Sequence, residues 1–152
     1  MLQTLEQPKP AVGSLANQHT LAGTATVRGK GLLLGKDATI HIQPAPANHG
    51  IVFQRTDLNP PVTIPALAGN VIERARRTTL KLGDATLETV EHCMSAFAGL
   101  RIDNALITID APDLPCGNGS APPLVDAILE VGLTELDAPR GIFRITEPIL
   151  VE

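Results

Sequence analysis

The 152-residue sequence carries a formal net charge of −4, with 43% hydrophobic and 18% charged residues, a composition that favours one folded domain, or one domain and the start of another, over a disordered chain. Aromatic residues make up only 2%, and Lys and Arg form no dense cluster, which argues against binding to nucleic-acid bases or to duplex phosphates. No apolar run is long enough to cross a bilayer, and the first 19 residues lack the apolar segment of a signal peptide, so we expect a cytoplasmic protein.

The N-terminal part of the chain is expected to begin as a tail and to continue as strands. Residues 1–19 are polar and are predicted to form a disordered tail. Beyond them apolar and polar residues alternate, and the runs 37–44 and 50–57 are rich in strand-forming residues. The glycine-rich run 29–35 and the run APANHG at 45–50 are predicted to be the intervening loops.

Two further β segments are predicted before the first helix. The run NPPVTIPA at 59–66 cannot be a central strand, because its prolines lack the N–H groups that a ladder needs. Residues 77–88 read as a hairpin that turns at Gly83 and Asp84.

The second half of the chain alternates helix and strand. A helix is expected from Thr89, a good N-cap, to Gly99, because Val90, Met94 and Phe97 recur at helical spacing. A buried strand at 104–110 and a loop at 111–119 follow.

A second helix is predicted from Ser120 to Val131, capped by Ser120 and ended by Gly132, and residues 141–152 read as a strand. Leu124, Val125, Ile128 and Leu129 would form the apolar face of this helix. Strands followed by helix–strand–helix–strand predict an α+β fold with two helices packed on one face of a sheet.

Glu91 and His92 are the residues best placed for chemistry. At the start of a helix the dipole favours a carboxylate and a neutral imidazole, the states wanted for a general base and a metal ligand. The ordinary alternative is a Glu that satisfies the dipole and a structural His. A catalytic zinc needs three protein ligands, and no HExxH or other closely spaced pair joins His92 to His19, His41 or His49. A zinc site made by this chain alone is therefore not expected.

Other reactive groups have plainer explanations. Ser120 lacks the GxSxG elbow of a nucleophile and is explained as a cap. The GxG of residues 29–31 lacks the strand–GxGxxG–helix context of a dinucleotide site. Cys93 and Cys116 form no CxxC pair and are expected to be reduced thiols. The alternation of His41 with Ile40 and Ile42 turns it away from the core.

Several stretches together resemble the zinc-dependent UDP-3-O-acyl-N-acetylglucosamine deacetylases of lipid A biosynthesis. The resemblance runs from about Thr20 to Glu152. The segments that carry it are GKGLLLG, IQPAPANHGIVFQRTDLNPPV, RRTTL, TVEHCMSAFAGLRIDNALITIDAPDLP and NGSAPPLVDAILEVG.

The resemblance implies a site and a reaction. Members of the family remove acetate from an acylated UDP-sugar with the help of zinc. In the motif TVEH, Glu91 would be the general base and His92 a zinc ligand, while Thr78 and Thr79 would line the substrate site. The remaining zinc ligands would come from a second, similar domain, so residues 20–140 would be the first domain and 141–152 a strand leading into the second.

The chain also departs from the family pattern. Leu33 stands where members usually carry His, and Asn118 stands where they usually carry Asp. Because the remaining zinc ligands are missing, we expect the first half of such an enzyme, a fragment or a split half that is inactive alone and needs a complementary chain or self-associates. The two departures favour a different interpretation. The alternative is a non-catalytic module of the same fold that binds a partner or a sugar nucleotide. An exported β-rich binding domain has no support, because nothing resembles a signal peptide.

Overall fold

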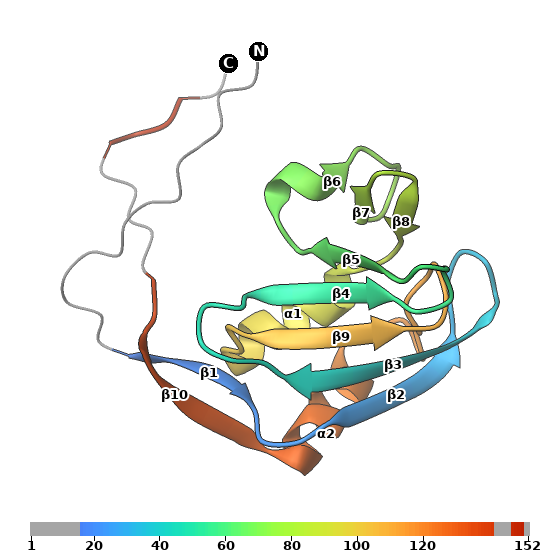
Figure 1. The fold of residues 1–152 in the computed structure, drawn as a ribbon. Helices are drawn as coiled ribbons and strands as arrows, with labels where there is room; N and C mark the ends of the chain where they lie inside the picture. The colour runs from blue at the N-terminus through green and yellow to red at the C-terminus, as the bar shows by residue number, and fades with distance from the viewer. Residues whose placement is uncertain (1–15, 142–146, 151–152) are drawn as a thin grey trace.

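A computed structural model of the chain describes residues 16–141 and 147–150. Their elements form one five-stranded sheet, two smaller sheets and two α-helices (Figure 1). In chain order they are β1 (Asn17–Leu21), β2 (Ala25–Lys30), β3 (Asp37–Pro44), β4 (Ile51–Arg55), β5 (Val62–Pro65), the 3-10 helix η1 (Ala68–Asn70), β6 (Val71–Ile72), β7 (Thr79–Leu82), β8 (Ala85–Leu87), α1 (Glu91–Leu100), β9 (Ala105–Ile109), α2 (Pro122–Val131) and β10 (Leu133–Pro139). None of the helices in these ranges is long and apolar enough to span a membrane.

The central sheet has the strand order β2-β3-β9-β4-β5, with β4 and β9 parallel and the other neighbours antiparallel. Strand β9 lies in its middle, and the prediction of a buried strand at 104–110 is confirmed. Ile40, Ile42 and Ile107 point to one face and are fully buried, because side chains alternate along a strand. His41 points to the other face, where its Nδ1 lies 2.9 Å from Oγ1 of Thr26.

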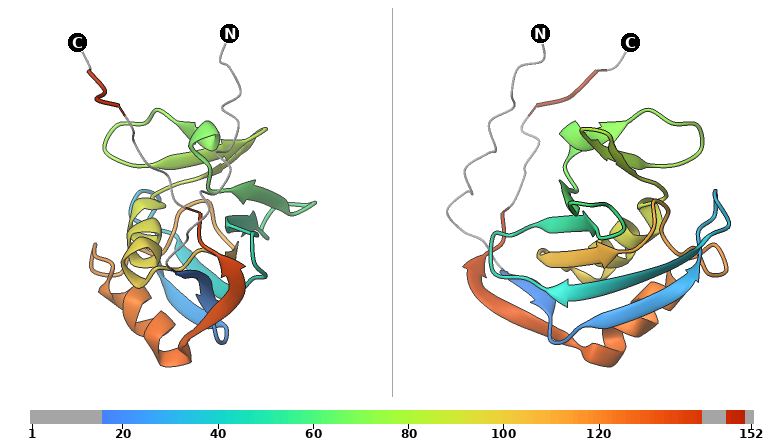
Figure 2. Two further views of the ribbon diagram at one scale, coloured as in Figure 1. Left: turned by 90° about the vertical axis from the view of Figure 1, so that its left-hand side faces the viewer. Right: turned by 45° about the vertical axis from the view of Figure 1, so that its right-hand side comes forward.

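Both helices pack on the buried face of this sheet, so the predicted α+β architecture is confirmed (Figure 2). Helix α1 buries Cys93, Ala96 and Phe97, and α2 buries Leu124 and Ile128. The predicted apolar face of α2 is only partly buried. Val125 is half-buried, and Leu129 remains 55% exposed.

The proline-rich run 59–66 contains the edge strand β5, as expected for residues that cannot donate to a second neighbour. The hairpin predicted at 77–88 is also present as β7 and β8, and Gly83 has a φ of 58° at its turn. With β6 they form a three-stranded sheet next to β5 (Figure 1).

The predicted tail boundary at residue 19 is wrong, because residues 17–19 belong to β1, which pairs with β10. Their polar side chains are used internally: Gln18 is 7% exposed and bonds to the side chains of Asn48 and Asn104. The polarity of this segment therefore marks buried hydrogen bonds rather than a solvated tail. Residues 1–15 lie outside the described residues.

The start and end of the first helix also differ from the prediction. Thr89 is not its cap: it has a φ of 57°, and α1 begins at Glu91 with Val90 in the cap position. The helix passes through Gly99 and ends at Leu100, because Arg101 supplies the left-handed C-cap at a φ of 57°.

The second helix begins two residues later than predicted. Ser120 does not cap it, since Ala121 holds the cap position and Pro122 opens the first turn. Gly132 ends it as expected. In the predicted C-terminal strand, residues 142–146 and 151–152 lie outside the described residues, and 147–150 form no strand. The sequence did not reveal β10, which pairs with β1, a strand that begins inside the predicted tail.

Candidate functional site

Glu91 and His92 are the first two residues of α1, and both are half-buried. They lie one position earlier in the helix than predicted, because Val90 rather than Thr89 precedes it. The first turn still presents unpaired N–H groups and the positive end of the helix dipole. Adjacent helical residues point in different directions, so both side chains can border one site without competing for one position.

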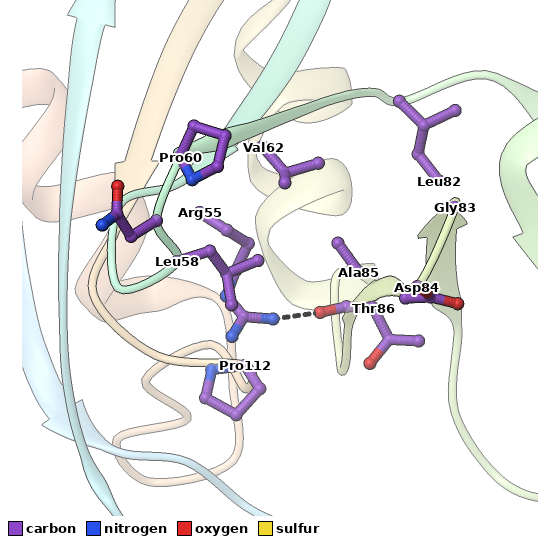
Figure 3. A pocket seen from close by; sticks show the side chains of 11 residues that line it. Arg55, Leu58, Pro60, Val62, Leu82, Gly83, Asp84, Ala85, Thr86 and Pro112 are labelled. Atoms are coloured by element: carbon purple, nitrogen blue, oxygen red, sulfur yellow. Dashed lines mark hydrogen bonds between the residues drawn. The ribbon is translucent and has the colours of Figure 1, made fainter.

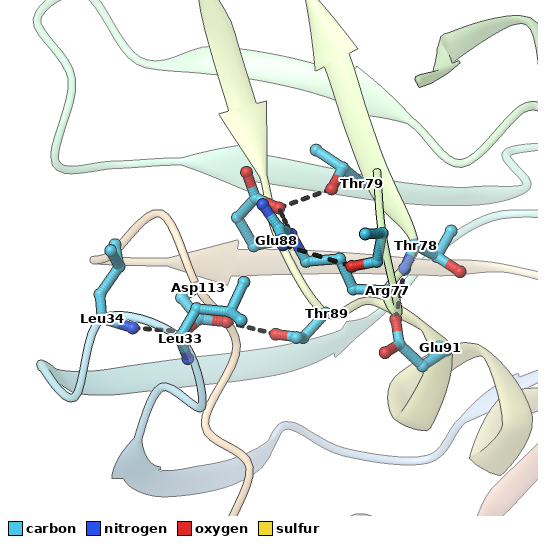
Figure 4. Close-up of polar contacts among 10 residues, drawn as sticks. Leu33, Leu34, Arg77, Thr78, Thr79, Glu88, Thr89, Glu91 and Asp113 are labelled. Atoms are coloured by element: carbon cyan, nitrogen blue, oxygen red, sulfur yellow. Dashed lines mark hydrogen bonds and ion pairs between the residues drawn. The ribbon is translucent and has the colours of Figure 1, made fainter. Parts of the chain in front are cut away.

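The carboxylate of Glu91 is held by the segment that leads into β7 (Figure 4). The backbone N–H of Thr78 donates to its Oε2 at 3.0 Å, and the N–H of Val90 donates to the carbonyl of Thr78 at 3.3 Å. Two hydrogen bonds therefore join residue 78 to the helix start. No described residue hydrogen-bonds the other carboxylate oxygen of Glu91, so this oxygen can accept a proton from a bound water.

Thr78 and Thr79 differ in their surroundings. Thr78 is half-buried beside Glu91. Thr79 is fully buried, and its hydroxyl donates to Oε2 of Glu88 at 2.5 Å. The same oxygen accepts a hydrogen bond from Nε of Arg77 at 2.8 Å. Glu88 thus fastens the whole segment 77–79 against β8, a role that the sequence did not reveal.

Asp113 is a second residue that the sequence reading missed. It is only 2% exposed, and its carboxylate accepts hydrogen bonds from the hydroxyl of Thr89 and from the backbone N–H groups of Leu33 and Leu34. Figure 4 shows that it connects the 31–36 loop with the residue two positions before Glu91. Its only signal in the sequence was a carboxylate inside the otherwise apolar run APDLP.

His92 borders a small cavity of about 10 Å³ between α1 and the 114–116 loop, with Cys93 and Cys116 among its walls. Space of this size admits about one water molecule and no sugar nucleotide. Burial raises the pKa of the Cys93 thiol, which keeps it protonated and unsuited to ligate a metal. No described residue hydrogen-bonds either ring nitrogen of His92, so the imidazole is free to coordinate a metal.

The described residues do not complete a metal site. Within residues 16–141 and 147–150 no three His, Cys, Asp or Glu side chains come together in a group that could hold a metal ion. His19 lies in β1, 3.9 Å from a carboxylate oxygen of Glu135, and His49 bonds to the neighbouring carbonyl of Gly50. The residues present therefore fit one ligand, His92, with Glu91 beside it.

A larger open groove of about 580 Å³ lies between the 55–62 segment and the β7–β8 hairpin (Figure 3). None of the residues predicted to act in catalysis or in metal or substrate binding lines it. Its one buried cation, Arg55, is fully engaged: it donates to both oxygens of Asp57 at 2.7 and 2.6 Å and to the carbonyl of Thr86. We therefore assign no chemistry to the groove. Arg55 instead links the β7–β8 hairpin to the central sheet.

The remaining predicted positions lie around the same end of the fold. The hydroxyl of Ser120 donates to the side chain of Asn118, and neither side chain is hydrogen-bonded to His92. Leu33 is 42% exposed on the loop that Asp113 anchors.

Comparison with known proteins identifies the family of the chain. The family model for UDP-3-O-acyl N-acetylglycosamine deacetylase matches residues 18–152. The chain is similar to proteins named UDP-3-O-acyl-N-acetylglucosamine deacetylase from three bacteria. Identity is 46% over 138 residues for Pseudomonas entomophila (strain L48), covering 91% of this chain and 46% of that protein. It is 45% over 135 residues for Cellvibrio japonicus (strain Ueda107), covering 89% and 45%. It is 43% over 135 residues for Myxococcus xanthus (strain DK1622), covering 89% and 43%. The chain spans just under half the length of these curated relatives.

Proposed function

The chain belongs to the UDP-3-O-acyl N-acetylglycosamine deacetylase family, and from this premise we propose that it supplies the general base and one zinc ligand of a deacetylase of lipid A biosynthesis. The observation that carries the proposal is the pair at the start of α1. Glu91 is held by the N–H of Thr78 at 3.0 Å, directly beside the half-buried His92.

In the proposed reaction, a water molecule attacks the acetamide carbonyl of an acylated UDP-sugar. His92 would be one ligand of a zinc ion, which would supply polarisation of that carbonyl and a lower pKa for the water. Glu91 takes the proton of the attacking water, the carbon–nitrogen bond breaks, and the proton passes to the leaving amine, so that acetate and a free amine result. Thr78 would border the substrate. Thr79, also expected there, is fully buried, so it would only hold the segment in place through its hydrogen bond to Glu88.

We propose that this chain is inactive alone, because a catalytic zinc site uses three protein ligands and the described residues contribute one. The other ligands would come from a complementary chain in the cytoplasm. In the absence of such a chain, self-association would cover exposed apolar side chains such as Leu129 on α2. Light scattering after size-exclusion chromatography should then show more than a monomer, and a clean monomer would count against self-association.

The decisive experiment replaces the matching first half of the Pseudomonas entomophila relative with residues 18–152 of this chain. The isolated chain, supplied with zinc and the acylated UDP-sugar, should release no acetate, whereas the chimera should release it. His92→Ala in the chimera should abolish both zinc retention and turnover. His41→Ala, on the opposite face of the sheet, should leave both unchanged.

A non-catalytic module of the same fold is the second candidate, and the observation in its favour is Leu33. This apolar side chain is 42% exposed where family members usually carry His. A folded but inactive chimera, together with saturable binding of UDP to the isolated chain by calorimetry, would support the module and reject the enzyme half.

A further inference from the structure

The turn before α1 has a conformation that a β-branched residue seldom adopts. Thr89 has a φ of 57° and is 3% exposed. At positive φ the Cβ atom crowds the backbone, so Thr is rarely found there without support. Val90, which follows in the cap position, has no side-chain hydrogen bond to the helix start. The place and direction of α1 therefore depend on what holds Thr89.

Asp113 supplies that support from across the fold. Its Oδ1 accepts the hydroxyl hydrogen of Thr89, and its Oδ2 accepts the N–H of Leu33 at 2.7 Å and that of Leu34 at 3.3 Å (Figure 4). A buried carboxylate with three donors has little freedom to move.

The backbone on either side of Asp113 is also tied to the chain just before Thr89. The N–H of Glu88 donates to the carbonyl of Pro112 at 2.8 Å, and the N–H of Leu114 donates to the carbonyl of Glu88 at 3.3 Å. Gly31 makes the close approach possible, because a Cβ there would lie 2.6 Å from Oδ2 of Asp113.

We propose that Asp113 is a positioning residue for Glu91 and His92: it holds Thr89 in the left-handed conformation that sets the start of α1, while Thr78 holds Glu91 from the other side. The proposal rests on the proposed function, in which Glu91 and His92 carry the chemistry. Asp113 itself is hydrogen-bonded to neither side chain.

The amide of Thr78 reports this role, since it is hydrogen-bonded to Glu91. Amide hydrogen exchange should be measured by NMR on the ¹⁵N-labelled 152-residue chain. The amide of an Asn side chain offers one acceptor oxygen instead of two, so Asp113→Asn should speed exchange at the Thr78 amide by roughly ten-fold. The exchange rates of the amides in β3 and β9 should stay within about two-fold of those in the unmodified chain. The ring resonances of His92 should shift and those of His41 should not.

Two further variants test the hydrogen bond between Thr89 and Asp113 separately from the other contacts of Asp113. Thr89→Val removes only the hydroxyl, keeps the branched shape and leaves the loop contacts of Asp113 in place, so it should reproduce the faster exchange even if Asp113→Asn does not fold. Thr89→Gly adopts positive φ without help. In that background the added effect of Asp113→Asn should fall to about three-fold or less, which a double-mutant cycle measures.

Three results would overturn the proposal. The first is an unchanged Thr78 amide in Thr89→Val. The second is an effect of Asp113→Asn that is equally large in the unmodified chain and in the Thr89→Gly variant. The third is faster exchange throughout β3 and β9, which would mean that Asp113 stabilises the fold in general. None of these measurements needs turnover, so they remain informative if the chimera proves inactive, and failure of the positioning role would not by itself reject the deacetylase.

Discussion

The backbone N–H of Thr78 and the carboxylate of Glu91 are joined by a 3.0 Å hydrogen bond. A segment 13 residues earlier thereby restrains the side chain proposed as the base. Because the donor belongs to the backbone, the contact depends on the position of the 77–79 segment rather than on the identity of the Thr78 side chain. Glu88 secures that segment through Arg77 and Thr79, so the site is assembled from the hairpin and the helix together.

Glu91→Gln separates chemistry from structure. Gln keeps an acceptor oxygen for the N–H of Thr78, so the free energy of unfolding should change by less than about 0.5 kcal/mol. It cannot take a proton, so kcat of the chimera should fall by roughly 10²–10⁴-fold with KM little changed. Urea denaturation and acetate release measure the two effects. Glu130→Gln, on the exposed side of α2, is the control, and full activity of Glu91→Gln would rule out Glu91 as the base.

Gly31→Ala and Gly99→Ala should change stability in opposite directions. An added Cβ at 31 would lie 2.6 Å from Oδ2 of Asp113, and the resulting displacement should cost about 1–3 kcal/mol. At Gly99, inside α1, an added Cβ meets nothing within 4 Å, so Ala should stabilise by roughly 0.5–1 kcal/mol through its helix propensity. Urea denaturation measures the stability of both variants. If Gly31→Ala were as stable as the unmodified chain, the 31–36 loop would accommodate the added Cβ at no cost in free energy.

The Arg55–Asp57 pair should make stability depend on pH. The hydrogen bond from the Arg55 guanidinium lowers the pKa of Asp57. A carboxyl whose pKa is lowered by folding adds stability that is present above its unfolded pKa of about 4 and is lost as the pH falls through the folded value. Asp57→Asn leaves the guanidinium of Arg55, which is 6% exposed, without its charge partner, so we expect a loss of about 1–3 kcal/mol at pH 7.

The difference between Asp57→Asn and the unmodified chain should begin to narrow below about pH 4, because the carboxyl of the unfolded chain takes up a proton there, whereas the folded one does so only at lower pH. Urea denaturation from pH 3 to 7 measures it. Asp37→Asn, which removes an exposed ion pair with Lys30 at 2.9 Å, should cost about 0.5 kcal/mol or less at any of these pH values. A constant difference for Asp57→Asn across the range would contradict the linkage.

Cys93 should resist alkylation in the folded chain. It is fully buried and its pKa is raised by burial, so both access and the thiolate fraction are low. Iodoacetamide at pH 8 should modify it at least about 100-fold more slowly in buffer than in concentrated urea. Peptide mass spectrometry measures both rates, with Cys116 in the same digest for comparison. Rapid labelling in buffer would show that α1 opens readily.

Local patterns determined most of the framework. Alternation placed Ile40 and Ile42 inward and His41 outward, prolines excluded the 59–66 run from the middle of the sheet, and branched apolar residues predicted a buried strand at 104–110. These predictions succeeded because each depends on side-chain periodicity or on missing N–H groups, which neighbouring residues along the chain already define. The motif around Glu91 and His92 likewise pointed to the start of a helix.

Tertiary contacts decided the rest. Thr89 and Ser120 have the residue types of helix caps, yet their hydroxyls bond to Asp113 and Asn118, because a partner distant in sequence or a tighter local turn competes for the same donor. Residues 17–19 read as a polar tail but pair with β10, since burial turns polar side chains such as Gln18 into hydrogen-bonding links. The sequence by itself placed Glu91 and His92 in the first turn of a helix, although that helix begins at Glu91 rather than at Thr89. Only the folded chain decided how they are held, because Thr78 and Asp113 approach the helix start through long-range contacts that no local spacing encodes.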